Sequence, residues 1–203
     1  MEKSGWQLKE GQYRKTFLNE DELWKLFNNF LSTKSVKNTA YKFIFMRSLL
    51  LNLEQFDTNR SINYIKLFET FTQTYWDLYI KEQKRQSRET QISIAEKIFN
   101  EYCTEELRLK EFNSLSISIQ GELIKKINVA CQINVIGAVY ADFNKSIYSF
   151  SNSESILILN PIFFEFMLKY KKILLKLNYL EWIKYMEKVN DTININRLDY
   201  LSY

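Results

Sequence analysis

Basic side chains gather at several places along this sequence and are its main candidates for chemistry. They are Lys81, Lys84, Arg85, Arg88, Lys125, Lys126, Lys145, Lys169, Lys171, Lys172 and Lys176. Because ammonium and guanidinium groups bind phosphate oxygens, such clusters could contact a DNA backbone. Cations also stabilise helix C-termini, so the cluster from Lys81 to Arg88 is explained as well by compensation of the helix dipole on a solvated face. The net charge of +4 fits nucleic acid or an acidic partner and selects neither.

Histidine is absent from the sequence, and this excludes several kinds of catalysis by the chain itself. Without it there is no histidine general base, no Ser-His-Asp triad, no HExxH zinc helix and no metal-binding histidine of an HNH nuclease. The four glycines stand apart from one another, so the sequence has no glycine-rich phosphate loop. We therefore predict no cofactor and no catalytic residue.

Carboxylates remain as a route to a metal site. Asp77, followed by Glu82, Gln83 and Lys84, matches the order of acidic and lysine residues in a restriction-type nuclease core, where carboxylates hold a metal ion. Those residues should lie on strands, whereas here they follow a helical pattern. Asp142 and Glu154 could approach a cation at predicted turns, although acidic residues in turns usually serve the turn itself. We predict no metal ion.

Cys103 and Cys131 are isolated within apolar sequence. This pattern is typical of buried small hydrophobic residues in a reducing compartment. The first residues lack the apolar core of a signal peptide, and no run of 18 uncharged apolar residues occurs. The sequence therefore predicts a cytoplasmic protein without membrane contact.

The chain is organised around residues 38–56, NTAYKFIFMRSLLLNLEQF, whose apolar side chains leave almost no polar face. A helix that is apolar nearly all round must be surrounded by other elements, and Asn38 or Thr39 can cap its start. With 46% hydrophobic residues, one proline and four glycines, the rest should also form long helices. We expect a mostly α fold of the α+β class, a helical bundle around this central helix.

Helical spacing of apolar residues predicts the other helices. They are 20–31, 61–80 with Ser61 as cap, 93–103, 116–131, 161–174 with Asn160 as cap, and 177–189. Residues 1–19 should form an arm that packs through its aromatic side chains. We expect one domain over residues 1–203, with 104–116 as the natural boundary if it divides into subdomains 1–110 and 111–203.

Residues 135–159 are rich in β-branched and aromatic side chains and predict a small antiparallel β-hairpin or three-stranded ribbon. Its strands would be 135–140, 146–150 and 155–159. We expect one face to pack on the neighbouring helices, with Lys145, Ser149 and 151–153 facing solvent. The ribbon either covers the core or acts as a wing beside a recognition helix, in which case Lys125, Lys126 and Lys145 would face one DNA groove.

Four segments resemble a known family. They are KNTAYKFIFMRSLLLNL, FTQTYWDLYIKEQKRQ, NVIGAVYADFNKSIYSFS and LNPIFFEFMLKYKKILLKLNYLEWIKYMEKVN. Together they are similar to the helical region that precedes the HNH domain in a group of bacterial endonucleases, over residues 38–190. The cysteine and histidine sites of that family have no counterpart in this sequence, so no catalytic residue carries over. The resemblance implies a part in restriction or anti-phage defence, in which this region engages DNA or a partner subunit.

Three functions are therefore open. The first is a non-catalytic DNA-engaging region of an HNH-type nuclease system. The second is a protein-interaction or dimerisation subunit of a defence complex, since a helical bundle rich in Tyr, Trp and Phe has the anchors that interfaces favour. The third is an autonomous nuclease that holds its metal by carboxylates. The candidate partners are DNA, a nuclease domain or other partner protein, and a second copy of the chain.

Overall fold

The computed structural model describes residues 7–14, 17–32, 38–87 and 92–190. Within these residues the α-helices are α1 (Glu20–Leu31), α2 (Tyr41–Leu51), α3 (Tyr64–Trp76), α4 (Ile94–Tyr102), α5 (Ile117–Asp142) and α6 (Pro161–Asn190). The four strands are β1 (Glu10–Gly11), β2 (Ser61–Asn63), β3 (Tyr148–Ser151) and β4 (Ile156–Leu159). Short helical turns η2 (Leu53–Gln55), η3 (Asp77–Lys81) and η4 (Phe112–Ser114) complete the fold. The predicted mostly α, α+β class is confirmed.

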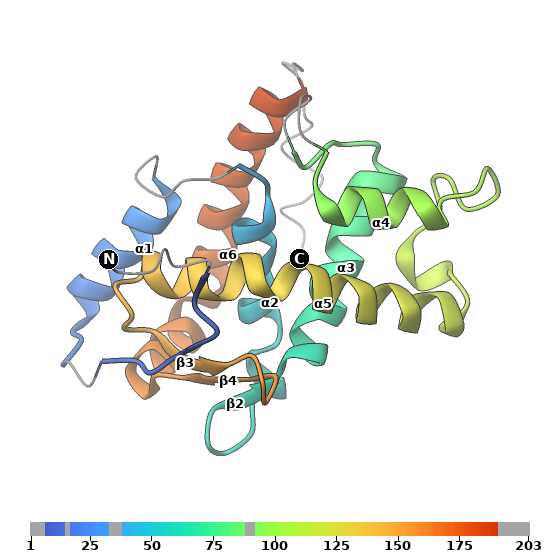
Figure 1. The fold of residues 1–203 in the computed structure, drawn as a ribbon. Coiled ribbons are helices and arrows are strands. Elements are labelled where there is room, and N and C mark those ends of the chain that lie inside the picture. The colour runs from blue at the N-terminus through green and yellow to red at the C-terminus, as the bar shows by residue number, and fades with distance from the viewer. Residues whose placement is uncertain (1–6, 15–16, 33–37, 88–91, 191–203) are drawn as a thin grey trace.

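Helix α2 lies at the centre of the molecule, with α3, α5 and α6 packed around it (Figure 1). Phe45 and Leu49 lie on one side of α2 and Phe43 on another, and all three are buried, as a helix apolar nearly all round requires. It begins at Tyr41, whose amide N–H lies 3.4 Å from the Thr39 hydroxyl that accepts from it. The predicted central helix is confirmed, although its regular part is shorter than residues 38–56.

Polar side chains begin the remaining helices. Asn19 and Glu22 of α1 form a capping box in which each side chain accepts the other's backbone N–H at 2.9 Å. Asn160 accepts from the Ile162 N–H at 2.9 Å beside Pro161, as predicted for α6. The cap predicted for α3 was wrong, because Asn63 accepts from the Ile65 N–H and Ser61 belongs to β2.

Besides the start of α3, two larger differences from the predicted helices occur, in α5 and α6. Helix α5 does not end near residue 131 but continues to Asp142, so the strand predicted at 135–140 was wrong. Val135, Ile136 and Val139 are each fully buried, so this part of α5 has no polar face that would show the helical period. Helix α6 is likewise a single helix of 30 residues, where two helices were predicted.

The sheet has the order β1-β3-β4-β2, with every neighbouring pair antiparallel. Only the β3–β4 hairpin was predicted, because β1 and β2 come from segments far away in the sequence. The Tyr148 hydroxyl donates to the Ile136 carbonyl at 2.5 Å and joins the sheet to α5. Ser149 is buried rather than solvent-facing, since the arm covers it: it donates to Gln12 Oε1 and accepts from the Tyr13 N–H, each at 3.0 Å.

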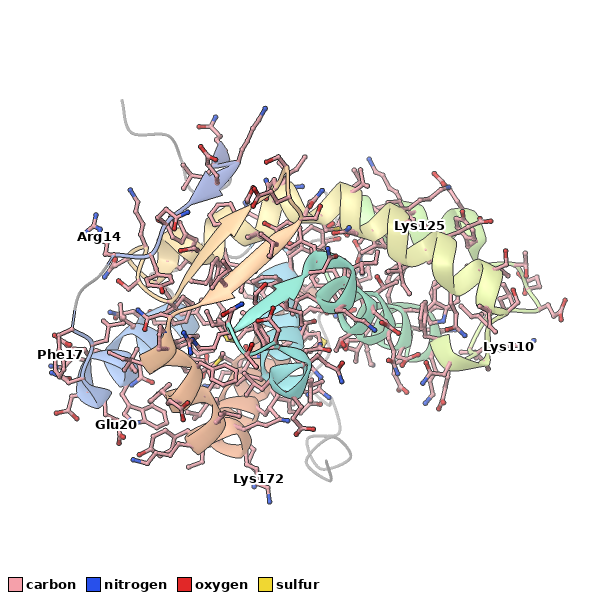
Figure 2. The ribbon with its side chains drawn as sticks, turned by 90° about the horizontal axis from the view of Figure 1, so that it is seen from below. Arg14, Phe17, Glu20, Lys110, Lys125 and Lys172 are labelled. Carbon is pink, nitrogen blue, oxygen red and sulfur yellow. The ribbon has the colours of Figure 1, made fainter. Side chains whose placement is uncertain are left out.

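One hydrophobic core joins both halves of the chain. Helices α5 and α6, from beyond the proposed boundary at 104–116, pack directly on α2, and α5 also packs on α3. The buried residues form one cluster that reaches from Leu18 to Met186. The sheet lies against one end of this helical core and faces the viewer in Figure 2.

Gly11 lies close against the rings of Phe150 and Tyr140, and this leads to a prediction. A Cβ atom at Gly11 would lie 2.8 Å from ring atoms of both Phe150 and Tyr140. These two rings already pack against each other, with their centroids 5.2 Å apart. Gly11→Ala should therefore cost about 1–3 kcal/mol of unfolding free energy, as overpacking does. Denaturant unfolding measures it. Gly121→Ala is the control, because a Cβ there meets nothing within 4 Å, and an equal effect of both changes would contradict the prediction.

Candidate functional site

The basic residues after α3 are largely engaged within the protein. Lys81 lies at the end of η3, where its Nζ is 2.8 Å from Glu111 Oε1, and this carboxylate raises the pKa of Lys81. Lys84 and Arg85 are half-buried. The backbone N–H and C=O of Arg85 both bond to the Asn190 side chain, at 2.9 and 3.0 Å. Arg88 lies outside the described residues.

The basic residues of the predicted wing do not meet in one place. Lys125 and Lys126 lie on the exposed side of α5, and Lys126 sits over the Tyr102 ring at 4.7 Å and 3.6 Å from Glu101. Lys145 follows the other end of the helix. Because α5 is unbroken from Lys125 to Asp142, about 25 Å of helix separates Lys125 from the end of α5 that precedes Lys145. The arrangement of a recognition helix beside a wing, with these three lysines at one groove, was wrong.

The third group lies on α6. Lys169 Nζ is 2.7 Å from Glu20 Oε2, and Lys171 Nζ is 3.5 Å from Glu54 Oε1. Lys172 and Lys176 are exposed and make no ion pair with the residues that the structure describes. Figure 2 shows Lys172 pointing outward at the lower edge of the molecule, whereas Lys125 lies on α5 in the upper right of the view. The candidate basic residues therefore occupy separate surfaces.

The acidic residues that the structure describes do not assemble a metal site. Asp77 lies in η3, and its Oδ1 accepts the Phe112 N–H at 2.7 Å; burial raises the pKa of this carboxyl group. Glu82 Oε1 is 3.7 Å from Lys81 Nζ. Asp142 bonds to Lys42 Nζ at 2.7 Å, and Glu154 lies beside the arm with Glu10. Within the described ranges, no group of three or more His, Cys, Asp or Glu side chains could hold a metal ion.

A buried polar cluster around Glu96 was not identified from the sequence. Glu96 is 1% exposed, and its carboxylate accepts the Gln86 N–H at 2.8 Å, the Ser93 N–H at 2.8 Å and the Ser87 hydroxyl. Ser93 Oγ accepts the Glu96 N–H in return, so the pair forms a capping box at the start of α4. The S-x-x-E pattern of Ser93 and Glu96 is the feature of the sequence that could have identified this capping box. The cluster holds the segment before α4 against the bundle and is closed to solvent.

Gln86 extends this cluster to α6. The Trp182 indole N–H donates to Gln86 Oε1 at 2.9 Å, and the Gln86 amide donates to the Lys84 carbonyl at 2.9 Å. The Tyr185 hydroxyl donates to the Gln86 carbonyl at 3.3 Å. The second half of α6 thus fixes the segment from Lys84 to Ser87, whose backbone leads from α3 towards α4.

Both cysteines are free thiols. Cys131 is fully buried beside Tyr41, and burial raises the pKa of its thiol to about 12. Cys103, at the end of α4, is half-buried. The sequence prediction of two buried cysteines is thus confirmed for Cys131 and too strong for Cys103.

This difference predicts selective thiol labelling. Because the thiolate is the reactive form, a thiol reagent at neutral pH should label Cys103 within minutes and Cys131 only when the protein unfolds. Mass spectrometry should show one adduct on the labelled native protein and two adducts on the protein labelled after unfolding in urea. Cys103→Ser should abolish native labelling. Rapid native labelling of the Cys103→Ser variant would contradict the buried position of Cys131.

No helix in the described part of the chain is long and apolar enough to cross a membrane. Comparisons of the chain with protein-family models, with curated proteins and with solved structures found no significant match. The candidate functional surface is therefore argued from the geometry of the chain alone. It is the outer face of α6, the solvent-facing side where Ile173 and Leu180 lie beside Lys172 and Lys176.

Proposed function

We propose that this chain is a non-catalytic domain that binds a protein partner. The observation that carries the proposal is the outer face of α6, where the aliphatic side chains of Ile173 and Leu180 are exposed beside Lys172 and Lys176. Mixed aliphatic and basic surfaces of this kind suit a protein interface, whose centre is apolar and whose rim is charged.

The distribution of the basic residues supports a protein partner over DNA. Ion pairs alone do not prevent phosphate contact, because exposed pairs are worth only about 0–1 kcal/mol and exchange partners readily. Their positions matter more: Lys125 on α5 and Lys172 on α6 lie in different parts of the molecule (Figure 2), rather than side by side on one track along a duplex. A domain that neutralises many phosphates needs such a track.

The test is a titration of fluorescently labelled duplex DNA with the full chain at low salt, followed by anisotropy. We expect no saturable binding. Saturable binding whose logarithmic salt slope is steeper than about −3 would mean that several phosphates are neutralised. That result would replace the proposal by the DNA-engaging function.

The nature of the partner is proposed from the sequence resemblance to HNH endonucleases. In this proposal the domain belongs to a restriction or anti-phage system and binds its nuclease component. Sequencing the DNA downstream of the codon for Tyr203 tests it. An HNH-coding segment in frame or in the next gene would support the proposal, whereas unrelated neighbouring genes would remove the link with nucleases and leave the interaction domain.

A further inference from the structure

The first strand of the sheet belongs to the N-terminal arm. Residues 7–14, which we call the arm strand, run along the outer edge of β3, and Figure 2 shows β1 in blue at this edge of the sheet. The paired part, β1, is only two residues long. Leu8, Gly11 and Tyr13 are half-buried, and the other five residues of the arm strand are exposed. The arm strand therefore contributes little buried apolar surface to the fold.

Backbone hydrogen bonds attach the arm strand near both of its ends. The Asn152 N–H donates to the Lys9 carbonyl at 2.9 Å, and the Arg14 N–H donates to the Lys145 carbonyl at 2.9 Å. A segment held by hydrogen bonds with few buried apolar contacts opens at a lower free energy than the core. We therefore expect the arm strand to open while the helical core remains folded.

The surface beneath the arm strand is buried and aromatic. Phe150 and Tyr140 are 2% and 4% exposed, and Gly11 lies directly against their rings. Opening of the arm strand would uncover these rings beside the unpaired edge of β3. A strand edge of this kind readily pairs with another chain.

We propose that two copies of this chain exchange their arm strands, so that residues 7–14 of each copy lie on β3 of the other. This inference goes beyond the proposed function and concerns a different surface from the outer face of α6. The arm is long enough to reach a second copy beside it. Gln7 precedes the buried Leu18 by 11 residues, which span at most about 40 Å when extended.

The requirements of the β3 edge select a second copy as the occupant. A strand on this edge needs a residue without a side chain beside Phe150 and an acceptor for the Ser149 hydroxyl. Gly11 and Gln12 meet both requirements, with 3.0 Å between Ser149 Oγ and Gln12 Oε1. The arm strand of a second copy is identical and would make the same contacts, so the exchange requires no other complementary sequence.

Single cysteines on two different chains test the exchange. Glu10 of β1 pairs with Ser151 of β3. The Cβ atoms of such opposite residues are about 4.5–5.5 Å apart, so a small shift brings cysteines there into disulfide range. One full-length chain carries Glu10→Cys and the other carries Ser151→Cys. Both carry Cys103→Ser, and Cys131 is buried, so the new cysteines can form a disulfide only between two chains.

The two folded proteins are mixed at high concentration in a glutathione redox buffer, and the linked dimers are identified by mass spectrometry. We expect the dimer that joins the cysteine of β1 in one chain to the cysteine of β3 in the other. Its yield should be at least about tenfold that of a control pair in which Glu105→Cys replaces Glu10→Cys, because docking of the arm strand raises the effective concentration of the two thiols. The Glu105 side chain is 85% exposed and lies outside the sheet.

Two further measurements separate arm exchange from random collision. Gly11→Val on the chain with Glu10→Cys should lower the yield by about tenfold or more, since its side chain would overlap both rings, whereas Gly121→Ala there should change it by less than about twofold. In the wild type, hydrogen exchange should be at least about tenfold faster at the Asn152 N–H than at the Cys131 N–H, because the arm strand protects the first and the core protects the second.

Thermal unfolding checks that each variant is folded. If Gly11→Val does not fold, Gln12→Ala takes its place, because it removes the acceptor for Ser149 without overpacking and should also lower the yield. Equal yields for the test and control pairs, a yield that the arm variant leaves unchanged, or exchange at Asn152 as slow as at Cys131 would each overturn the inference. Each of these results leaves the proposed function to the DNA titration, which does not depend on the arm strand.

Discussion

Replacing Glu96 by alanine should lower the free energy of unfolding by about 3–5 kcal/mol, a large part of the 5–15 kcal/mol that stabilises a typical domain. The carboxylate accepts from two backbone N–H groups and the Ser87 hydroxyl in a site from which water is excluded. Its removal leaves these donors buried without a partner, and each such donor costs about 1–3 kcal/mol. The expected loss is therefore much larger than that of one exposed cap.

Denaturant unfolding of the variant measures this effect. Glu101→Ala is the matched control, because Glu101 lies on the same helix and makes an exposed ion pair with Lys126; it should cost less than about 1 kcal/mol. Glu96→Gln keeps one acceptor oxygen and should fall between the two. A loss below 1 kcal/mol for Glu96→Ala would mean that water reaches the cluster and that it does not anchor the segment before α4.

Replacing Phe71 by alanine should cost about 3–5 kcal/mol, the range found for deletion of a buried aromatic ring. Phe71 is fully buried in α3, where its ring centroid lies 5.1 Å from that of Phe68, 5.9 Å from Tyr41 and 6.1 Å from Tyr75. These rings come from α2 and α3. Because the ring fills the space between the central helix and its neighbour, its loss leaves a cavity that rigid helices fill only in part.

Ile65→Ala on the same helix is the control, since Ile65 is 38% exposed. It should cost less than about 1 kcal/mol by loss of buried area. Phe71→Leu keeps most of the volume and should cost less than Phe71→Ala. An unchanged slope of unfolding free energy against denaturant would show that the folded state, rather than the unfolded state, is affected. Similar losses for Phe71→Ala and Ile65→Ala would contradict the packing around α2.

Local signals in the sequence predicted most of the helices correctly. The apolar run after Thr39 predicted the central helix, because its composition leaves no face for solvent. Asn160 followed by Pro161 predicted the start of α6, because a side-chain acceptor and a residue without an N–H group both favour a helix N-terminus. These features depend on neighbouring residues only, so no knowledge of distant contacts was needed.

The end of α5 shows where this kind of inference fails. Residues 135–140 have β-branched side chains and favour a strand by local preference. In the structure their burial on several sides by other elements stabilises the helix, and the same burial removes the alternation of polar and apolar residues that identifies a helix. The wing arrangement of Lys125, Lys126 and Lys145 depended on that strand and was lost with it.

By itself, the sequence determined the fold class, the central helix and the absence of histidine chemistry, since composition and local spacing are properties of the chain alone. Only the tertiary structure decided which side chains meet. It buried Glu96 beneath the segment before α4, covered Ser149 with the arm and set Lys125 and Lys172 in different parts of the molecule. Such contacts join residues far apart in the sequence, 137 positions for Ser149 and Gln12 and 149 for Lys169 and Glu20, and their geometry follows from tertiary packing, which no local pattern encodes.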